Sequence, residues 1–218
     1  MIAGEYTAQQ AYRAFNAQLL AEETPADDEI VLTSGKSYSN VFHANGGSAS
    51  FSVMANTLRG VYGTDVLLAT ANSFTGSVLQ ADYNKKMAAS MIMPNGLMSR
   101  QRTMTGAELK ETVRAFVEGC EGGFVPFNRG SLPVVSGIAV EVKEASGSYT
   151  LTGITRNGQP LKDDDTVTVT CLAAEKQMEA LLASESGTSL DGDTWVKNRW
   201  RDYLSGGGAA LAEPENYM

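Results

Sequence analysis

The sequence predicts an α+β fold, with helices packed on mixed β-sheets. Three features favour this class. Helical and strand-like segments alternate in the first half of the chain, strands joined by an Asn-Gly turn follow, and helical periodicity returns near the end. The chain has 218 residues, of which 43% are hydrophobic, so it can bury the core of one large or two small domains.

The chain begins with a predicted helix over Thr7–Glu23, which has a capping box and an aligned apolar stripe. A short strand over Ile30–Leu32 follows, and a loop rich in Ser, Gly and Asn covers 33–48. The apolar spacing of Ser50–Tyr62 predicts a second helix that ends at Gly63.

A buried strand is predicted over Asp65–Thr70, because this short apolar run directly follows a helix. The residues Ala71–Gly76 form a turn at its carboxyl end, where α/β proteins often place ligands. An ordinary loop is the competing interpretation. Asp82–Ala89 is predicted to be a short helix, and Pro94-Asn95-Gly96 a turn.

The clearest local signal is the helix predicted over Met104–Gly119, preceded by a strand over Leu97–Thr103. Thr105 and Glu108 have the spacing of a capping box, and apolar residues then recur at helical intervals. This helix is a scaffold element and not a site.

The second half predicts strands over Val134–Val142, Tyr149–Thr155 and Thr166–Leu172. A hairpin turn over Arg156–Gln159 contains the Asn-Gly pair of a type I′ turn. The remaining predicted elements are a loop over 119–131, a solvated turn at Asp163–Asp165, a helix over Ala173–Ser186 and a last helix capped by Asp193.

Composition excludes several functions. The net charge of -8 argues against a broad nucleic-acid contact, and no apolar run approaches the ~20 residues that span a bilayer. The chain has one histidine, His43, which leaves too few ligands for a multi-histidine metal site, and we expect it on a surface or loop. Cys120 and Cys171 lack metal or redox spacing, and a disulfide between them stays open.

Five segments, in their order along the chain, resemble the C-terminal domain of the 5′-nucleotidase family, the bacterial UDP-sugar hydrolase and ecto-nucleotidase group. The segments are SFSVMANTLRGVYGTDVLLATANS, MPNGLMSRQRTMTGAELKETV, LPVVSGIAVEV, ITRNGQPLKDDDTVTVTCLA and TWVKNRWRDYLSGGGAALAEP. By this resemblance, 1–29 is a linker-helix region and 30–218 is the C-terminal-like domain.

The resemblance implies that the metal ions and the attacking water belong to an N-terminal metallophosphoesterase domain outside this chain. We therefore expect no cofactor and no catalytic residue in this chain. The chain alone would be inactive, and the parent protein that contains it would be a hydrolase. The family's C-terminal domain binds the nucleoside part of the substrate between two aromatic rings. Its members are mostly exported, so an extracellular, periplasmic or cell-surface location is expected.

The family's ligand-binding positions fall on Asn72, Phe74, Ser77, Asn95 and Leu132, whereas its loop with the second aromatic ring is missing and Trp195 is a candidate replacement. The NGG-x-x-R-like turn becomes Asn72–Ser77, in which Asn72 matches, Phe74 replaces a glycine and Ser77 replaces the arginine. The candidate substrate-binding residues are Asn72, Phe74, Ser77, Asn95, Leu132 and Trp195. Trp195 or Tyr83 would supply a second ring, and Arg100 and Arg102 share one face of a strand.

Two functions follow as hypotheses. The first is a substrate-recognition domain for a nucleotide or nucleoside-like molecule, in a parent protein that hydrolyses nucleotides or related phosphate esters. The alternative is a structural or interaction module that kept the fold and lost the nucleotide site, because the arginine and both rings of the aromatic clamp are lost from the family's positions.

Overall fold

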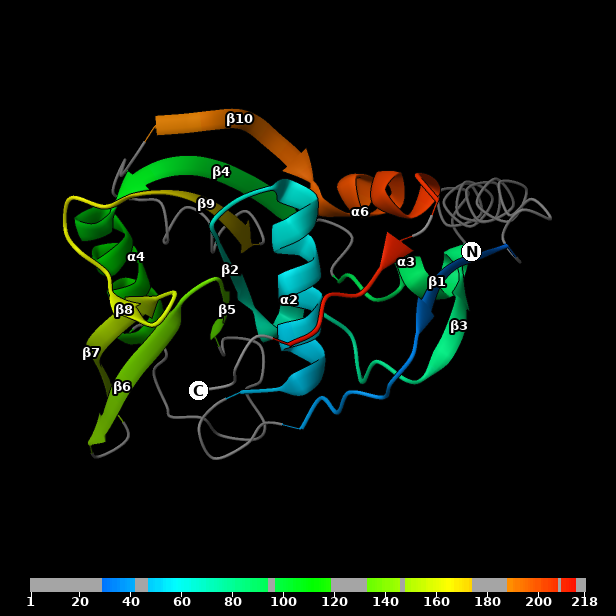
Figure 1. Ribbon diagram of the computed structural model, residues 1–218, viewed down its shortest axis with the longest axis horizontal. Helices are drawn as coiled ribbons and strands as arrows, with labels where there is room; N and C mark the ends of the chain where they lie inside the picture. Colours follow the sequence, from blue (N-terminus) through cyan, green and yellow to red (C-terminus); the bar gives the residue numbers. More distant parts are fainter. Residues whose placement is uncertain are drawn as a thin grey trace, which may run out of the picture.

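A five-stranded mixed sheet lies at the centre of the molecule (Figure 1). The computed structural model describes residues 29–41, 47–93, 97–118, 133–145, 148–173, 188–207 and 209–214. In spatial order, the strands are β10 (Thr188–Trp195), β4 (Met98–Thr105), β9 (Thr166–Ala173), β2 (Val66–Thr70) and β5 (Pro133–Ser136). β2 and β9 are parallel, and the other pairs are antiparallel.

Both faces of this sheet are covered, because alternate residues of β2 enter two separate cores. Leu67 and Ala69 belong to one apolar cluster, whereas Val66 and Leu68 belong to the other. Successive side chains of a strand point to opposite faces, so one fully apolar strand can support both cores. All five residues of β2 are buried, which confirms the predicted double-sided strand.

Helix α2 (Ala49–Tyr62) covers one face and contacts β2 and β5. Helix α6 (Val196–Ser205), helix α3 (Lys85–Ala89) and a small sheet contribute to the same core. That sheet has the order β11 (Ala209–Ala210), β1 (Ile30–Ser34), β3 (Ala81–Asn84), and it lies beside α3 in Figure 1. The carboxyl-terminal part of the chain is thereby held against α2.

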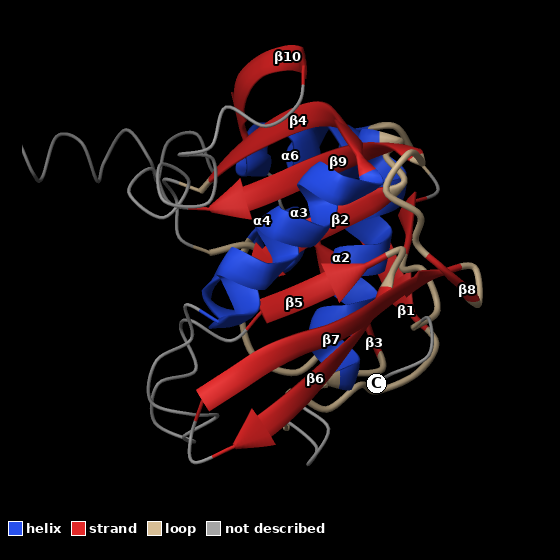
Figure 2. Cartoon of the chain, turned by 90° about the vertical axis from the view of Figure 1, so that its left-hand side faces the viewer, coloured by secondary structure: helices blue, strands red, loops and turns tan. Residues whose placement is uncertain are grey.

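The other face is covered by α4 (Gly106–Glu118) and a β-hairpin (Figure 2). The hairpin consists of β6 (Ala139–Ala145) and β7 (Ser148–Arg156). The short β8 (Gln159–Pro160) pairs with β7 and completes a separate three-stranded sheet. The predicted capping box is confirmed: the Thr105 amide donates to Glu108 Oε2 at 2.7 Å, and the Glu108 amide donates to Thr105 Oγ1 at 3.2 Å.

Three predicted elements differ from the structure. Strand β3 and helix α3 replace the single helix over 82–89, because the Asn84 side chain accepts from the Met87 amide and starts the helix there. Gly137, with φ of 84°, breaks the strand predicted over 134–142 into β5 and β6, which join different sheets. The last helix begins after Trp195, and Asp193 lies in β10 instead of capping it.

The predicted α+β class is confirmed, as are the strand at 30–32, the helix at 50–62 and the hairpin turn. Asn157 and Gly158 have φ of 52° and 74°, as a type I′ turn requires. The Asp163–Asp165 turn is also confirmed: Asp163 pairs with Lys110, and Asp165 accepts from the Lys162 amide. The predictions for Thr7–Glu23, His43, 94–96, 119–131 and 174–186 lie outside the described residues.

Candidate functional site

The turn that follows β2 has an apolar interior. Its first residues form a short 3₁₀ helix, Ala71–Ser73. The Phe74 ring is 5% exposed and packs against Phe51, with 5.9 Å between the ring centroids. The backbone of Phe74 also pairs with that of Ile92 in an isolated antiparallel β-bridge. Phe74 therefore supports the turn from inside and presents no open ring face to solvent.

The outer side of the same turn is polar. Asn72 and Ser77 are both exposed. The Ser77 hydroxyl donates to Asn40 Oδ1 and accepts from the Asn40 amide, each at 3.2 Å. Beneath them, Ser73 is fully buried and its Oγ finds no hydrogen-bond partner among the described residues. Such a buried hydroxyl marks a place where a water molecule or ligand group can bond.

Trp195 comes from a different element, the end of β10. The Met93 amide donates to the Ser73 carbonyl, and the Val196 amide donates to the Leu97 carbonyl. Trp195 pairs with Met98 and its side chain is 47% exposed. We use the name recognition strip for the three predicted site residues that are exposed: Asn72 and Ser77 in the turn after β2, and Trp195 at the end of β10. The predicted site residues Asn95 and Leu132 lie outside the described residues.

The other residues singled out from the sequence are buried or half-buried in the fold. Tyr83 is buried, and its hydroxyl bonds the backbone of Leu79, so it offers no second ring. Arg100 and Arg102 are half-buried on β4, and both make contacts with neighbouring groups. Cys171 is a free buried thiol, and burial raises its pKa to about 12, which keeps it protonated at neutral pH.

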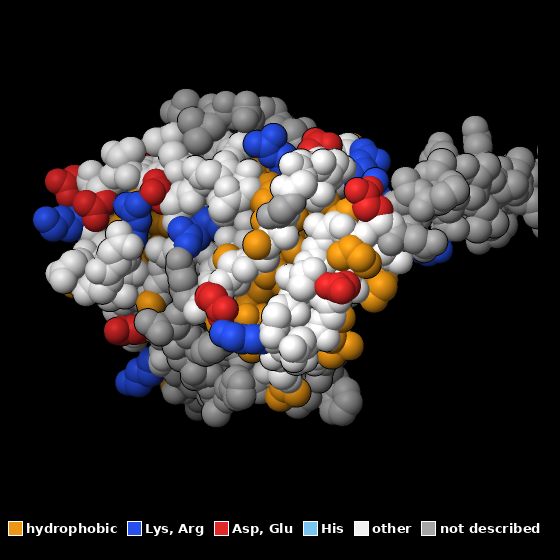
Figure 3. All heavy atoms as spheres, turned by 45° about the vertical axis from the view of Figure 1, so that its right-hand side comes forward, with side chains coloured by type: hydrophobic (Ala, Val, Ile, Leu, Met, Phe, Trp, Pro, Cys, Tyr) orange, Lys and Arg blue, Asp and Glu red, His pale blue; other side chains and the backbone are white. Residues whose placement is uncertain are grey.

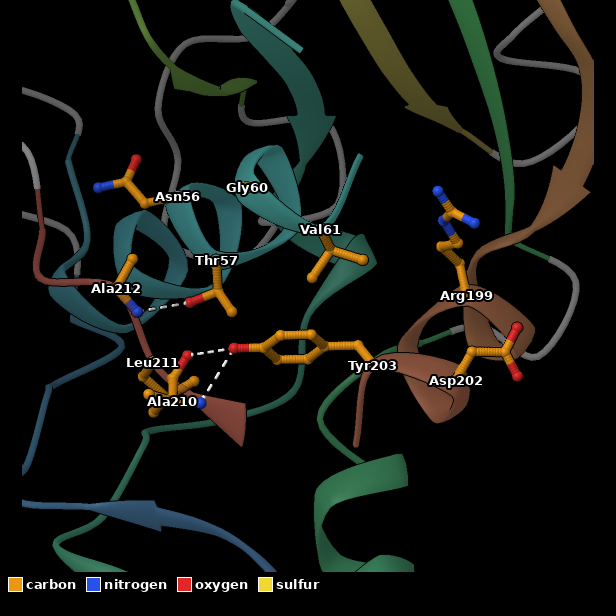
Figure 4. Close-up of a pocket in the computed structure, with 10 residues that line it drawn as sticks. All are labelled: Asn56, Thr57, Gly60, Val61, Arg199, Asp202, Tyr203, Ala210, Leu211 and Ala212. Atoms are coloured by element: carbon orange, nitrogen blue, oxygen red, sulfur yellow. Dashed lines mark hydrogen bonds between the residues drawn. The ribbon is translucent and has the colours of Figure 1, made fainter. Parts of the chain in front are cut away.

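A cavity of about 530 Å³ lies between α2, α6 and the carboxyl-terminal segment 209–214. We call it the α2–α6 pocket, and Figure 4 shows its lining residues. They are Asn56, Thr57, Gly60, Val61, Arg199, Asp202, Tyr203, Ala210, Leu211 and Ala212. Its walls are mixed in polarity, and its charged groups, Arg199 and Asp202, both come from α6.

A second cavity, of about 420 Å³, lies where the β6–β7 hairpin meets the central sheet. Asp65 forms an ion pair with Arg156 there, and its Oδ2 accepts from the amide and hydroxyl of Thr168 at 2.8 and 2.9 Å. Partial burial raises the pKa of Asp65, but these hydrogen bonds and the nearby guanidinium groups of Arg156 and Arg59 outweigh it and hold the pKa below its usual value. This arrangement fixes the hairpin to the sheet.

Neither cavity was predicted from the sequence. Each is assembled from residues that lie far apart in the chain. One local signal does point to the α2–α6 pocket: Gly60 lies inside a 14-residue helix, where glycine is unfavourable.

No protein-family model matches the chain, and no curated protein matches it. Solved structures do share its fold. A 5′-nucleotidase precursor from Thermus thermophilus aligns over 97% of this chain with a TM-score of 0.64 and 13% identity. An NAD nucleotidase from Haemophilus influenzae aligns over 94%, with a TM-score of 0.64 and 15% identity. A sulfate thiohydrolase from Thermus thermophilus aligns over 96%, with a TM-score of 0.64 and 13% identity.

The chain spans about 40% of the length of these proteins. It therefore has the fold of one part of 5′-nucleotidase-type proteins, consistent with their C-terminal domain, and the suspected resemblance is confirmed at the level of fold. Among the described residues, no group of three or more His, Cys, Asp or Glu is placed to hold a metal ion. No helix in the described part is long and apolar enough to cross a membrane.

Proposed function

We propose that this chain is the non-catalytic substrate-recognition domain of a 5′-nucleotidase-like metallophosphoesterase, and that it binds a nucleotide or a related phosphate ester. The observation that carries the proposal is the fold, which matches nearly all of this chain to about 40% of proteins named as nucleotidases. The hydrolytic metal site would belong to an N-terminal domain of the parent protein, with which this chain would cooperate outside the cytoplasm.

The recognition strip supplies suitable chemistry for such a ligand. A half-exposed indole such as Trp195 offers a face on which a base can stack, worth about 1–3 kcal/mol per base. Asn72 adds an exposed amide for hydrogen bonds to sugar or base edges, and Ser77, whose hydroxyl already bonds Asn40 as donor and acceptor, adds one remaining acceptor position. Phe74 does not contact the ligand in this proposal, and its buried ring holds the turn that carries Asn72 and Ser77 in place.

Calorimetric titration of the full chain with nucleosides, nucleoside monophosphates and nucleotide sugars tests this function. We expect heat from at least one class and no hydrolysis of any of them. The absence of binding by every member of the panel at about millimolar concentration, a level that detects even weak sites, would reject the nucleotide form of the proposal.

The alternative, a structural or interaction module, is favoured by one observation. The ring at the ligand-facing turn, Phe74, is packed in the core instead of facing a cleft. Under this alternative the chain would bind no small molecule of the panel, and Trp195→Leu would leave the function of the parent protein unchanged.

A further inference from the structure

The α2–α6 pocket has a feature that folding does not explain. Gly60 lies in the last turn of α2, three residues before the capping Gly63, and a Cβ added there would meet nothing within 4 Å. Its φ is not positive, so any residue could adopt its backbone conformation. Alanine would favour the helix more than glycine does, and neither close packing nor backbone geometry requires a glycine at this position. Its missing side chain does keep one wall of the pocket open.

The uncharged polar side chains of the pocket are already engaged by the protein itself. Thr57 Oγ1 accepts from the Ala212 amide at 2.9 Å, and Asn56 Nδ2 donates to the Glu213 carbonyl at 3.0 Å. The Tyr203 hydroxyl donates to the Ala210 carbonyl and accepts from the Ala210 amide, at 2.6 and 3.0 Å. Figure 4 shows the bonds of Thr57 and Tyr203 on the side of the pocket formed by the carboxyl-terminal segment. These hydrogen bonds fix the shape of the wall. They leave few uncharged hydrogen-bonding groups available to a ligand.

The cationic group of the pocket is Arg199. Its guanidinium lies over the Tyr62 ring, 5.9 Å from the centroid. Within the described part of the chain, no hydrogen bond or ion pair engages this exposed guanidinium. A guanidinium stacked on an aromatic face keeps its edge N–H groups available for a carboxylate.

The second charged residue of the pocket lining is Asp202, whose negative charge an anionic ligand would also meet. It lies three residues after Arg199 on α6, also lines the pocket and is exposed. Its carboxylate repels a doubly charged anion more strongly than a singly charged one. Val61 and Leu211 supply apolar walls, and Figure 4 shows Val61 facing the Tyr203 ring.

We propose that the α2–α6 pocket binds a small monocarboxylate with a compact apolar body. The carboxylate bonds the edge of Arg199, and the apolar body occupies the space beside Gly60, between Val61, Tyr203 and Leu211. This ligand differs from the nucleotide proposed for the recognition strip, and the pocket shares no residue with that strip.

Three probes separate the parts of the proposal: 3-phenylpropanoate, the uncharged 3-phenylpropanol, and inorganic phosphate. Each is titrated into the full chain by calorimetry and by NMR of backbone amides. We expect 3-phenylpropanoate to bind and to shift amides near Gly60 and Arg199, and the other two to bind at least tenfold more weakly. Equal binding of the alcohol, or no shift with 3-phenylpropanoate at about 10 mM, would overturn it.

Variants test the residues. Arg199→Gln removes the charge and should weaken 3-phenylpropanoate binding at least tenfold, whereas Arg201→Gln, an exposed arginine on the same helix that lies outside the pocket lining, should change it less than twofold. Gly60→Ala should raise the melting temperature and still weaken binding, and Gly60→Leu should abolish binding. Similar losses in both arginine variants, or unchanged binding in Gly60→Leu, would contradict the proposal. Trp195→Leu should leave this binding unchanged even if it abolishes nucleotide binding.

Discussion

At the scale of single residues, Asp65 connects two parts of the fold through one carboxylate. Its carboxylate bonds Arg156 through one oxygen and Thr168 twice through the other, so it joins the hairpin to the central sheet. It is half-buried, and hydrogen bonds to a charged group of this kind contribute about 1.5–3 kcal/mol. Loss of its charge should therefore loosen both elements together.

Asp65→Asn should lower the free energy of unfolding by about 2 kcal/mol at pH 7, because the ion pair and the charge-assisted hydrogen bonds are lost. Urea denaturation measures this value. Asp163→Asn is the matched control: its ion pair with Lys110 is at the surface, and its loss should cost less than about 1 kcal/mol. Equal losses in the two variants would contradict the role given to Asp65.

The same substitution should alter the pH dependence of stability. The pKa of Asp65 is lower in the folded protein than in the unfolded chain, so its charge stabilises the fold above the unfolded value of about 4. That contribution is lost as pH falls through the lower folded pKa. The difference between wild type and Asp65→Asn should be constant from pH 5 to 7 and should shrink below about pH 4. A difference that grows on acidification would contradict this.

Residue environments were the least predictable from the sequence. Phe74 and Tyr83 read equally well as ligand-facing rings, and both are buried because the small sheet and α2 close over them. Trp195, the other candidate for a second ring, lies exposed at the end of β10. Whether an aromatic side chain faces a core or a solvent depends on elements far away in the chain, which local spacing does not reveal.

At the scale of elements, local chemistry predicted boundaries well where a cap was present. The capping box at Thr105 and the glycine stop at Gly63 were both located correctly, because their hydrogen bonds form within a few residues. The break at Gly137 was missed. Its cause is the approach of the Asp65 backbone, a contact between segments more than 70 positions apart.

Gly137→Ala should therefore destabilise the fold strongly. A Cβ at Gly137 would lie 2.0 Å from the Asp65 carbonyl oxygen, and φ is 84°. We expect a loss of about 2–4 kcal/mol in urea denaturation, since backbone atoms must move in addition to the conformational strain. Gly158→Ala is the matched control, because its φ is 74° but nothing lies within 4 Å, and it should cost only about 1 kcal/mol. Similar costs at both sites would show that the contact with Asp65 is unimportant.

At the scale of the whole molecule, the central sheet separates two apolar cores, and the surfaces outside these two cores differ. Figure 3 shows hydrophobic side chains gathered on the face that carries β1, β3 and α3. Ile30, Leu79 and Met87 are exposed in this region. The turn after β2 and helix α6 both contribute side chains to the core on the side of α2, whereas the α4 side is occupied by the hairpin. Ligand contacts are therefore expected on the α2 side.

The fold class and the family-like order of elements could be predicted from the sequence, because apolar periodicity and turn residues are local properties. The ligand could not. The positions at which the resembling family places its arginine and one of its glycines hold Ser77 and Phe74, so recognition has to rest on other groups.

The central claim is that the exposed Trp195 recognises a nucleotide, and tryptophan fluorescence tests it directly. The chain has two tryptophans, and Trp200 is buried with its Nε1 bonded to the Ala88 carbonyl, so stacking should change only the Trp195 emission. We predict saturable quenching by a nucleotide, and an affinity reduced about tenfold in Trp195→Leu but retained in Trp195→Phe when measured by calorimetry. Quenching that is absent, or an affinity that is equal in wild type and Trp195→Leu, would contradict the claim.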